Sequence, residues 1–508
     1  MERRPKVKNL KELAKILSAV RTEDKTVVQC HGVFDLLHIG HIRHFEQAKK
    51  LGDILVVTVT PDRYVNKGPH HPAFPDNLRA ESIAALDCVD YVAINSWPTS
   101  VETIKLLKPD IYAKGSDYRD AGKDYSGKIT DEEAAVRSVG GNIAFTEDIT
   151  FSSSSLLNKY LPVFPKEVTD YMEGFSERYS TEEILKYLEN ARALKVLVIG
   201  EAIIDEYQYC ESIGMSAKEP VLATRYLSTE KFAGGILAVG NHVANFIDRV
   251  GLLTFLGSED SQEDFIQEHV GSNVEKIFLY KENSPTIVKR RFVESYLLTK
   301  LFEVYVINDE GLSKAENKAF CRKLSTILPQ YDVVIVADYG HGMMTNEAIE
   351  VLCNKARFLA VNTQANAGNR GFNTICKYPH ADFVSIAEHE IRLEFRNRTG
   401  GLKDMVATLS QKMGCSRVIV TRGKRGCLSY NNDEGFFEIP AFTQHVVDRI
   451  GAGDALLSLT ALCAAQQAPM EITGFIGNVV GAEAVLTISN KTPIERVSLF
   501  KHIVTLMK

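Results

Sequence analysis

Short runs of aliphatic and β-branched residues alternate with amphipathic stretches over the first part of the chain. The apolar runs lie at residues 26–30, 53–60, 89–94, 110–113 and 142–145. Between them, residues 41–51 and 77–86 carry apolar side chains at the spacing of a helix that buries one face. This alternation is typical of βαβ units, in which helices cover both faces of a parallel sheet. The pattern predicts an α/β domain that binds ligands at the carboxyl ends of its strands.

A second α/β series follows a change of character after residue 160. Prolines interrupt the sequence LPVFPKE, and a charged helical pattern follows at residues 180–194. New strand patterns lie at residues 195–200, 252–257, 332–338, 358–362, 382–386 and 417–423. Because a chain of 508 residues exceeds what one core usually serves, we expect separate domains. The predicted organisation is a first domain at 1–160, a connector at 161–194 and a second domain at 195–508.

The composition is that of an ordinary globular protein that acts on small molecules. Hydrophobic residues make up 45% and charged residues 24% of the chain, which allows sizeable cores. The formal net charge of -6 argues against nucleic acid as a partner, because binding to phosphate backbones requires a basic surface. No apolar run is long enough to span a bilayer, and the charged N-terminus lacks the apolar core of a signal peptide. The nine cysteines include no CxxC pair, which fits a reducing cytoplasm.

Glycine, aspartate and histidine residues gather where the first predicted strand passes into a helix. They form the sequence GxFDxxHxGH, whose members are Gly32, Phe34, Asp35, His38, Gly40 and His41. Backbone N–H groups and the helix dipole at such a junction attract anions. His38 and His41 lie three residues apart, so both can reach one phosphate from the first turn. The alternative is that both histidines are packed core residues, but the complete motif after a strand favours a nucleotide site.

Residues 26–155 resemble the cytidylyltransferase-like family of nucleotidylyltransferases, which implies a Rossmann-like fold. The resemblance extends beyond the HxGH motif to KPDIYAKGSDY and FSSSSLLNKY, and it implies phosphate contacts by Lys67 and Arg79. It also implies nucleotide-binding positions at Lys114, Gly115, Asp117, Ser152, Ser153 and Ser154. The sequence HIGH occurs in class I aminoacyl-tRNA synthetases as well. The chain has no KMSKS-like loop, which makes that alternative the weaker one.

The chemistry implied by this resemblance is nucleotidyl transfer. A substrate phosphate attacks the α-phosphate of a nucleoside triphosphate and pyrophosphate leaves, so catalysis consists of positioning and charge stabilisation. His38 and His41 would act at the α-phosphate. Lys67 and Arg79 would act at the triphosphate, with Mg2+ on the leaving pyrophosphate. Some relatives carry an arginine shortly before the serine motif, where this chain reads TEDITF, so both CTP and ATP stay open as donors.

A second glycine-rich motif, DRIGAGD, opens a helix of small residues near the C-terminus. Gly451, Ala452 and Gly453 are predicted to expose backbone N–H groups that form an anion hole. Asp454 lies in the first helical turn, where its carboxylate can take a proton from a hydroxyl that attacks a γ-phosphate. The alternative is a glycine-rich turn in which the aspartate only caps the helix. The α/β context favours the phosphate site.

Residues 195–508 resemble the ribokinase-like, or PfkB-type, carbohydrate kinases. The resemblance implies sugar-binding positions at Asp205, Gly234, Gly235 and Asn241, and ATP-binding positions at Thr421 and Gly423. Glu390 falls on a magnesium-associated NxxE motif, in which Ala387 replaces the asparagine. Residues 207–228 resemble a strand-rich lid that covers the sugar and often pairs subunits, so we expect a homo-oligomer, most simply a dimer.

The two resemblances occur together in the bifunctional heptose kinase/adenylyltransferase of ADP-heptose synthesis, here in reversed domain order. They imply a magnesium-dependent enzyme that uses ATP, and CTP or further ATP, to make a nucleotide-activated sugar. Two alternatives stay open at this point. One is a polyol kinase that also makes the CDP-polyol, and the other is a chain with one active domain and one regulatory binding module.

Overall fold

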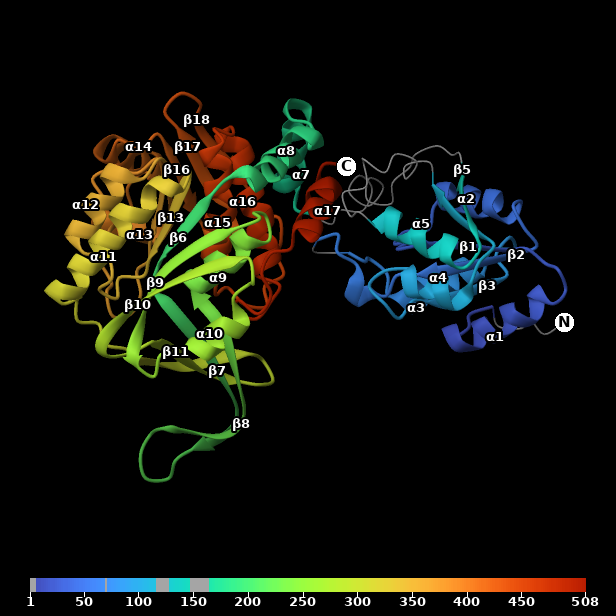
Figure 1. The fold of residues 1–508 in the computed structure, drawn as a ribbon, viewed down its shortest axis with the longest axis horizontal. Helices are drawn as coiled ribbons and strands as arrows, with labels where there is room; N and C mark the ends of the chain where they lie inside the picture. Colours follow the sequence, from blue (N-terminus) through green and yellow to red (C-terminus); the bar gives the residue numbers. More distant parts are fainter. Residues whose placement is uncertain (1–5, 69–70, 116–127, 147–163) are drawn as a thin grey trace. The chain divides into compact units, whose positions relative to one another are not determined.

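The computed structural model describes residues 6–68, 71–115, 128–146 and 164–508. The chain forms two compact units: residues 1–166 together with 497–508, and residues 167–496. Both units are α/β, and in each a sheet is flanked by helices (Figure 1), as the sequence predicts. Within the described residues, no helix is both long and apolar enough to cross a membrane.

The first unit is built on a five-stranded parallel sheet in the order β3-β2-β1-β4-β5. Its strands are β1 (Val27–Gly32), β2 (Ile54–Val59), β3 (Tyr91–Ile94), β4 (Ile111–Gly115) and β5 (Asn142–Thr146). Its helices are α1 (Leu10–Arg21), α2 (Ile39–Lys49), α3 (Asp76–Ala84), α4 (Val101–Leu107), α5 (Lys128–Ser138) and α17 (Arg496–Leu506) from residue 497 onward. The five strands overlap the five apolar runs that the sequence analysis singled out.

The central strand β1 is buried on both faces, as its unbroken apolar sequence requires. Val28 and Cys30 pack in one cluster with Phe45 of α2. Val27 belongs to a second cluster with Leu13 of α1, because successive side chains of a strand point to opposite faces. The carboxyl end of β1 therefore lies in the middle of the sheet edge. This position brings the HxGH motif to the place where such sheets bind ligands.

The second unit contains a nine-stranded sheet in the order β10-β9-β6-β13-β14-β15-β16-β17-β18. Its strands are β6 (Val196–Gly200), β9 (Val250–Glu259), β10 (Val274–Pro285), β13 (Val333–Asp338), β14 (Leu359–Thr363), β15 (Phe383–Ala387), β16 (Arg417–Thr421), β17 (Cys427–Asn431) and β18 (Gly435–Ile439). All neighbours pair in parallel except β16 with β17 and β17 with β18. The parallel part again places several strand ends along one edge.

Helices cover both faces of this sheet (Figure 1). On one side lie α11 (Lys314–Ile327), α12 (Asn346–Lys355), α13 (Glu388–Glu394) and α14 (Leu402–Met413). On the other side lie α9 (Ile236–Ala244), α15 (Ala452–Ala465) and α16 (Met470–Ala484), while α10 (Glu263–His269) lies near the lid. Helix α15 is buried along almost its whole length, so it is a core helix whose N-terminus faces the strand ends.

A separate four-stranded sheet, in the order β12-β11-β7-β8, projects from the second unit as a lid (Figure 1). Its strands are β7 (Ala202–Met215), β8 (Leu222–Gly235), β11 (Ile287–Glu294) and β12 (Thr299–Val306). The hairpin β7–β8 falls on the predicted lid sequence. The second hairpin, β11–β12, was not predicted, and it supplies residues to the site described below.

Residues predicted as a connector form two helices, α7 (Lys166–Arg178) and α8 (Thr181–Asn190), that pack on the second unit. Phe175 of α7 is fully buried, and its ring stacks on that of Phe475 with 4.4 Å between the centroids. Arg178 forms an ion pair with Glu471 at 2.7 Å. The structured part of the stretch is therefore not a free linker, because its apolar stripe has a partner in α16.

Candidate active sites

The HxGH motif forms one compact group at the end of β1. His38 is the N-cap residue of α2, and its Nδ1 accepts a hydrogen bond from the N–H of Gly40 at 3.1 Å. His41 lies in the first turn, and the two imidazole rings stack with 3.9 Å between centroids. The ring of Phe34 meets His41 edge to face at 5.2 Å. The predicted convergence of the two histidines at one helix N-terminus is present in the structure.

His41 is electrically neutral at physiological pH. Burial lowers the pKa of His41 to about 3, and the neighbouring charges of His38, His44 and Lys67 act in the same direction. A neutral imidazole can donate an N–H to an anion without bringing a charge of its own. At this position His41 is therefore suited to orient a phosphate oxygen, and the cationic side chains near it must supply the charge.

Asp35, a predicted nucleotide-binding residue, anchors a loop. Its carboxylate contacts His71 Nδ1 at 2.7 Å and accepts a hydrogen bond from the N–H of Ala73 at 2.6 Å. Burial acts to raise the pKa of Asp35, but the hydrogen bonds from His71, Ala73 and Phe74 outweigh it and lower the pKa below its ordinary value. Asp35 thus holds residues 71–74 beside the HxGH motif instead of presenting a free carboxylate.

Arg79, the second residue predicted to contact a triphosphate, makes hydrogen bonds inside the protein. Its side chain is 2% exposed and donates to the carbonyls of Phe74 at 2.8 Å and Thr60 at 2.9 Å. It donates further to the carbonyl of Val33 and to the carboxylate of Asp62. These four bonds engage all three nitrogens of the guanidinium, so Arg79 ties three loops together at the strand ends in this structure.

Lys67 is the other predicted phosphate contact. It makes no hydrogen bond or ion pair with any other residue in the described part of the chain. Burial lowers the pKa of Lys67, and the negative charge of Asp35 opposes that effect. The next residue, Gly68, has a φ of 90°, and a Cβ there would lie 2.3 Å from the ring of His502 in α17. The loop that carries Lys67 is therefore closely packed against α17.

The remaining predicted positions of the first site divide into four groups. Lys114 is buried and forms an ion pair with Glu132 at 2.7 Å, so it is a structural charge in this conformation. Gly115 ends β4 with open space where a Cβ would be, which leaves room for a ligand. Asp117, Ser152, Ser153 and Ser154 lie outside the described residues. Gly32 is required by Phe34, whose ring would be 2.9 Å from a Cβ.

The GAGD motif forms the N-terminus of α15, as predicted. Gly451 is the N-cap residue with a φ of 85°, and a Cβ there would lie 2.0 Å from Oδ1 of Asn490. Both the left-handed backbone and the close contact require glycine. Gly453 has open space at its Cβ position. The turn thus presents backbone N–H groups of the first helical turn beside an open region, which suits phosphate oxygens.

Asp454 lies at the bottom of this region and is 7% exposed. Tyr339 Oη donates to its Oδ1 at 2.9 Å, and Gln364 Nε2 donates to the same oxygen at 2.8 Å. Burial raises the pKa of Asp454 to about 7, and the charge of Asp205 adds to this effect. A carboxylate with this pKa is poised to accept a proton near neutral pH.

Asp205 and Gly234 form the second half of the same centre. A Cβ at Gly234 would lie 2.1 Å from Oδ2 of Asp205, so the carboxylate rests on the glycine backbone. Gly235 has a φ of 57° and begins α9. Arg291 forms a buried ion pair with Asp205. The electrostatic effect of Asp205 on Asp454 means that the predicted sugar-binding and base positions share one region.

Sequence reasoning missed the lid cations of this region. Lys289 of β11 pairs in register with Asp205 of β7, and Arg291 follows two residues later on the same face. Lys289 is 7% exposed, and burial lowers its pKa while Asp205 acts to raise it. Its ammonium makes no hydrogen bond or ion pair with another described residue. The available signal was the alternation in IVKRRFVE, which places two cations on one face of a strand.

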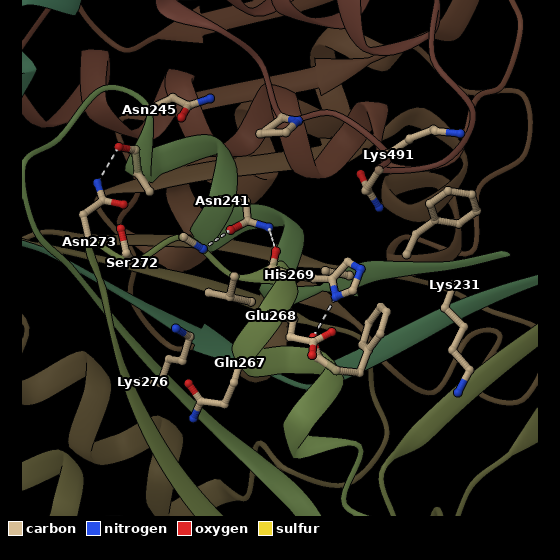
Figure 2. Close-up of a pocket in the computed structure, with 18 of the residues that line it drawn as sticks. Lys231, Asn241, Asn245, Gln267, Glu268, His269, Ser272, Asn273, Lys276 and Lys491 are labelled. Atoms are coloured by element: carbon tan, nitrogen blue, oxygen red, sulfur yellow. Dashed lines mark hydrogen bonds between the residues drawn. The ribbon is translucent and has the colours of Figure 1, made fainter.

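Asn241, a predicted sugar-binding residue, contacts the turn that follows α10. Figure 2 shows its amide bridging to the end of α10. Its Nδ2 donates to the carbonyl of His269 at 2.9 Å, and its Oδ1 accepts from the N–H of Gly271 at 3.0 Å. These bonds fix the turn between α10 and β10. Asn241 also lines a pocket together with His269, Lys231 and Lys491.

Glu390 does not fit the predicted role of magnesium ligand. Its two carboxylate oxygens accept hydrogen bonds from the N–H groups of Ala365 and Ala387, each at 2.8 Å. The described residues contain no cluster of three or more potential metal-binding side chains. Glu390 therefore caps α13 and fixes the end of β14. The other predicted nucleotide positions are at the end of β16, where Thr421 ends the strand and Gly423 has a φ of 59° with open space beside it.

The chain belongs to the pfkB family of carbohydrate kinases, which its residues 193–496 match. Residues 30–160 match the cytidylyltransferase-like family. Both families are those that the sequence motifs indicated.

The chain is similar to the bifunctional protein HldE of Trichlorobacter lovleyi, with 36% identity over 183 residues, 35% of this chain and 32% of that protein. The HldE protein of Geobacter metallireducens is 37% identical over 171 residues, 32% of each chain. The chain thus aligns with about a third of the length of these relatives. Phosphofructokinase-2 from Escherichia coli, solved in complex with potassium, shares the fold with a TM-score of 0.51 at 13% identity, over 62% of this chain and all of that one.

Proposed function

We propose that the protein is a bifunctional enzyme that phosphorylates a heptose-like sugar with ATP and joins a sugar phosphate to a nucleotide from CTP or ATP. The single observation that carries the kinase half is Asp454, a buried carboxylate in the first turn of a glycine-capped helix within electrostatic range of Asp205. The observation that supports the transferase half is the stacked pair His38 and His41 at a helix N-terminus.

In the kinase half, the acceptor sugar binds against Asp205 and the adjoining backbone of Gly234 and Gly235. The γ-phosphate lies at the N-terminus of α15, where backbone N–H groups and the helix dipole stabilise its charge. Asp454 takes the proton of the attacking hydroxyl. Its pKa of about 7 gives it more basicity than an exposed aspartate while leaving much of it ionised at neutral pH.

In the transferase half, His38 and His41 orient the α-phosphate, and Lys67 stabilises the charge of the triphosphate. No covalent intermediate with the protein is needed, because a substrate phosphate can displace pyrophosphate directly. Magnesium would neutralise phosphate charge in both reactions. Both carboxylate oxygens of Glu390 accept hydrogen bonds from backbone N–H groups, so Glu390 takes no part in this mechanism as a metal ligand.

A second candidate follows from Arg79 and Lys114. Both side chains already bind other groups of the first unit. A bound triphosphate would therefore meet fewer free cations than the sequence motifs predict. In this alternative the first unit binds a nucleotide and regulates the kinase without catalysing transfer. The two candidates agree on the kinase half and differ only in whether pyrophosphate is released.

Phosphorus NMR of the full chain with magnesium, ATP or CTP, and a panel of aldoses and aldose phosphates reads both reactions. Asp454→Asn should lose sugar-dependent ADP formation by ~10²–10⁴-fold, because it removes a general base. It should keep pyrophosphate release. His41→Ala should show the opposite pattern. Absence of pyrophosphate release from the parent chain with every combination would support the regulatory alternative, and full kinase turnover by Asp454→Asn would reject the base.

A further inference from the structure

The two oxygens of the Asp454 carboxylate have different surroundings. Tyr339 and Gln364 both donate to Oδ1, at 2.9 and 2.8 Å. Among the residues that the structure describes, none donates a hydrogen bond to Oδ2. Rotation of the carboxylate would break both bonds to Oδ1 together. The arrangement therefore keeps Oδ1 occupied and leaves Oδ2 without a donor from the described residues.

Tyr339 is itself held on both sides of its backbone. It is 2% exposed, and its N–H donates to Oε2 of Glu201 at 3.0 Å. Its carbonyl accepts two amide hydrogen bonds, from Nδ2 of Asn366 at 2.8 Å and from Nδ2 of Asn369 at 2.7 Å. These contacts fix the phenol against Asp454, because the peptide on each side of Tyr339 cannot move without breaking them.

Gln364 belongs to an unusual sequence, NTQANAGNRGFN, at residues 362–373, which we call the amide loop. The backbone N–H of Gln364 donates to the carbonyl of Asp338 at 2.9 Å, and the carbonyl of Gln364 accepts from Nδ2 of Asn373 at 3.2 Å. Asn373 donates in addition to the carbonyl of Asp338 at 3.0 Å. The amide loop thus binds the end of β13 and carries the second donor to Asp454.

We propose that Tyr339 and Gln364 are positioning residues that reserve Oδ2 of Asp454 for the proton of the acceptor hydroxyl. The inference rests on the proposed kinase function. As the acceptor oxygen forms its bond to the γ-phosphorus, its proton passes to Oδ2. The bond from phosphorus to the β,γ-bridging oxygen breaks, and ADP leaves with that electron pair.

The groups around Asp454 set its pKa, so the loss of the hydrogen bond from Tyr339 or Gln364 would appear as a change in that pKa. Burial raises the pKa of Asp454 to about 7, and the hydrogen bond from Tyr339 lowers it. The charge of Asp205 raises the pKa, whereas the charge of Lys289 and the hydrogen bond from Gln364 lower it. A base works in its ionised form, so activity is present above this pKa and is lost as the pH falls through it. Removal of either donor must move that loss to higher pH.

The test compares Tyr339→Phe and Gln364→Met with the parent chain. Each variant loses one donor to Oδ1 at nearly unchanged volume. A hydrogen bond to a charged group corresponds to a shift of about 1 pH unit. We expect the acid limb of kcat for ADP formation to move upward by that amount in each variant, with little change in KM for ATP. The acceptor is whichever aldose or aldose phosphate of the panel gives the fastest ADP release.

A second measurement needs no acceptor. Carbon NMR of the ligand-free full chain labelled at aspartate Cγ, with Asp454→Asn to assign the signal, gives the titration of Asp454 directly. The pH midpoint of this titration should shift upward in both Tyr339→Phe and Gln364→Met. Tyr378→Phe is the matched control, because Tyr378 is equally buried and donates to another aspartate, Asp338, at 2.8 Å. It should leave the titration of Asp454 where the parent chain has it.

The results separate the inference from the function on which it rests. Full kinase turnover by Asp454→Asn would overturn both. Loss of turnover in Asp454→Asn, together with an unmoved acid limb in Gln364→Met and Tyr339→Phe, would overturn the positioning role alone. The positioning role is also overturned if the titration of Asp454 moves while the acid limb of kcat does not. Because Gln364 is only partly buried, its variant answers the question even where Tyr339→Phe fails to fold.

Discussion

Oδ2 of Asp205 occupies the space beside Gly234 in which any other residue would carry its side chain, since a Cβ there would lie only 2.1 Å away. The contact joins the first strand of the lid, β7, to the end of β8 just before α9. Because the carboxylate fills this space, only glycine fits at position 234. The contact also makes the position of the Asp205 carboxylate sensitive to a single methyl group.

Gly234→Ala should therefore impair the kinase reaction without unfolding the second unit. The added methyl must displace the carboxylate of Asp205, and a misplacement of about 1 Å in an active site can cost on the order of 10²-fold in rate. ADP formation with the best acceptor of the panel gives the measurement. Gly481→Ala is the control, because that glycine has open space at its Cβ position within α16. Equal activity of the two variants would show that the contact is unimportant.

Acid should destabilise the second unit through His242. This imidazole is 3% exposed, and its Nδ1 accepts a hydrogen bond from the N–H of Ile494 at 3.0 Å. Burial lowers its pKa from 6.5 to about 4. The unfolded chain binds the proton first, so stability is complete above pH 6.5 and falls as the pH drops toward 4, by about 3 kcal/mol from this group.

Urea unfolding at pH 7 and pH 5 measures this effect. His242→Gln should flatten the dependence of unfolding free energy on pH between these values, because glutamine does not titrate. His445→Gln, at an exposed position, should keep the dependence of the parent chain. A dependence that His242→Gln leaves unchanged would assign the acid sensitivity to other groups, such as His341, whose pKa burial lowers to about 4.

Phe175→Ala should show that α7 is part of the second unit. The side chain is fully buried against Phe475, and removal of a buried phenylalanine ring typically costs ~3–5 kcal/mol. Urea unfolding of the full chain followed by circular dichroism reports the loss. Glu177→Ala, at an exposed position of the same helix, controls for a change in helix propensity. Equal stability of both variants would mean that α7 only rests on the surface.

The lid should pair two copies of the chain. Its sheet has two edge strands, β8 and β12, and it exposes large apolar side chains such as Tyr226, Phe302 and Ile213, which are 59%, 52% and 69% exposed. Unpaired edges and exposed apolar faces are usually covered by another chain. Light scattering at micromolar concentration should give a dimer. Tyr226→Asp with Phe302→Ser should yield monomers, whereas Phe372→Ser, which removes an exposed ring outside the lid, should not.

The motifs predicted those site residues that are neighbours along the chain. GxFDxxHxGH runs from the end of β1 into the first turn of α2, and GAGD opens α15, so His38, His41 and Asp454 could be located from the order of residues alone. Tyr339 and Gln364 could not, because they meet Asp454 only through the order β6-β13-β14 in the sheet and the burial of α15 against it. The pairing of β7 with β11 brought Lys289 to Asp205, whereas the local alternation in IVKRRFVE could show only that Lys289 and Arg291 share one face of a strand.

Arg79 shows the opposite case. Its residue type and its place in the motif fit a phosphate contact. The sequence does not show, however, which groups inside the folded chain compete with phosphate for its N–H donors. In the folded chain the carbonyls of Phe74 and Thr60 lie at the same strand ends and accept its N–H groups. The same competition removed Glu390 from the expected metal site. Motifs thus identified where the chemistry can occur, and the hydrogen bonds determined which side chains remain free for it.

The first unit is made of residues 1–166 and the last twelve residues of the chain, 497–508. A ribosome delivers its sheet early and its final helix last, with the whole second unit synthesised in between. Domains generally fold in the order in which they emerge. The half that begins to fold first is therefore completed only after the second unit has been synthesised, when α17 can pack beside Gly68. A chain that terminates early can carry a complete kinase unit and still leave the loop of Lys67 without its cover.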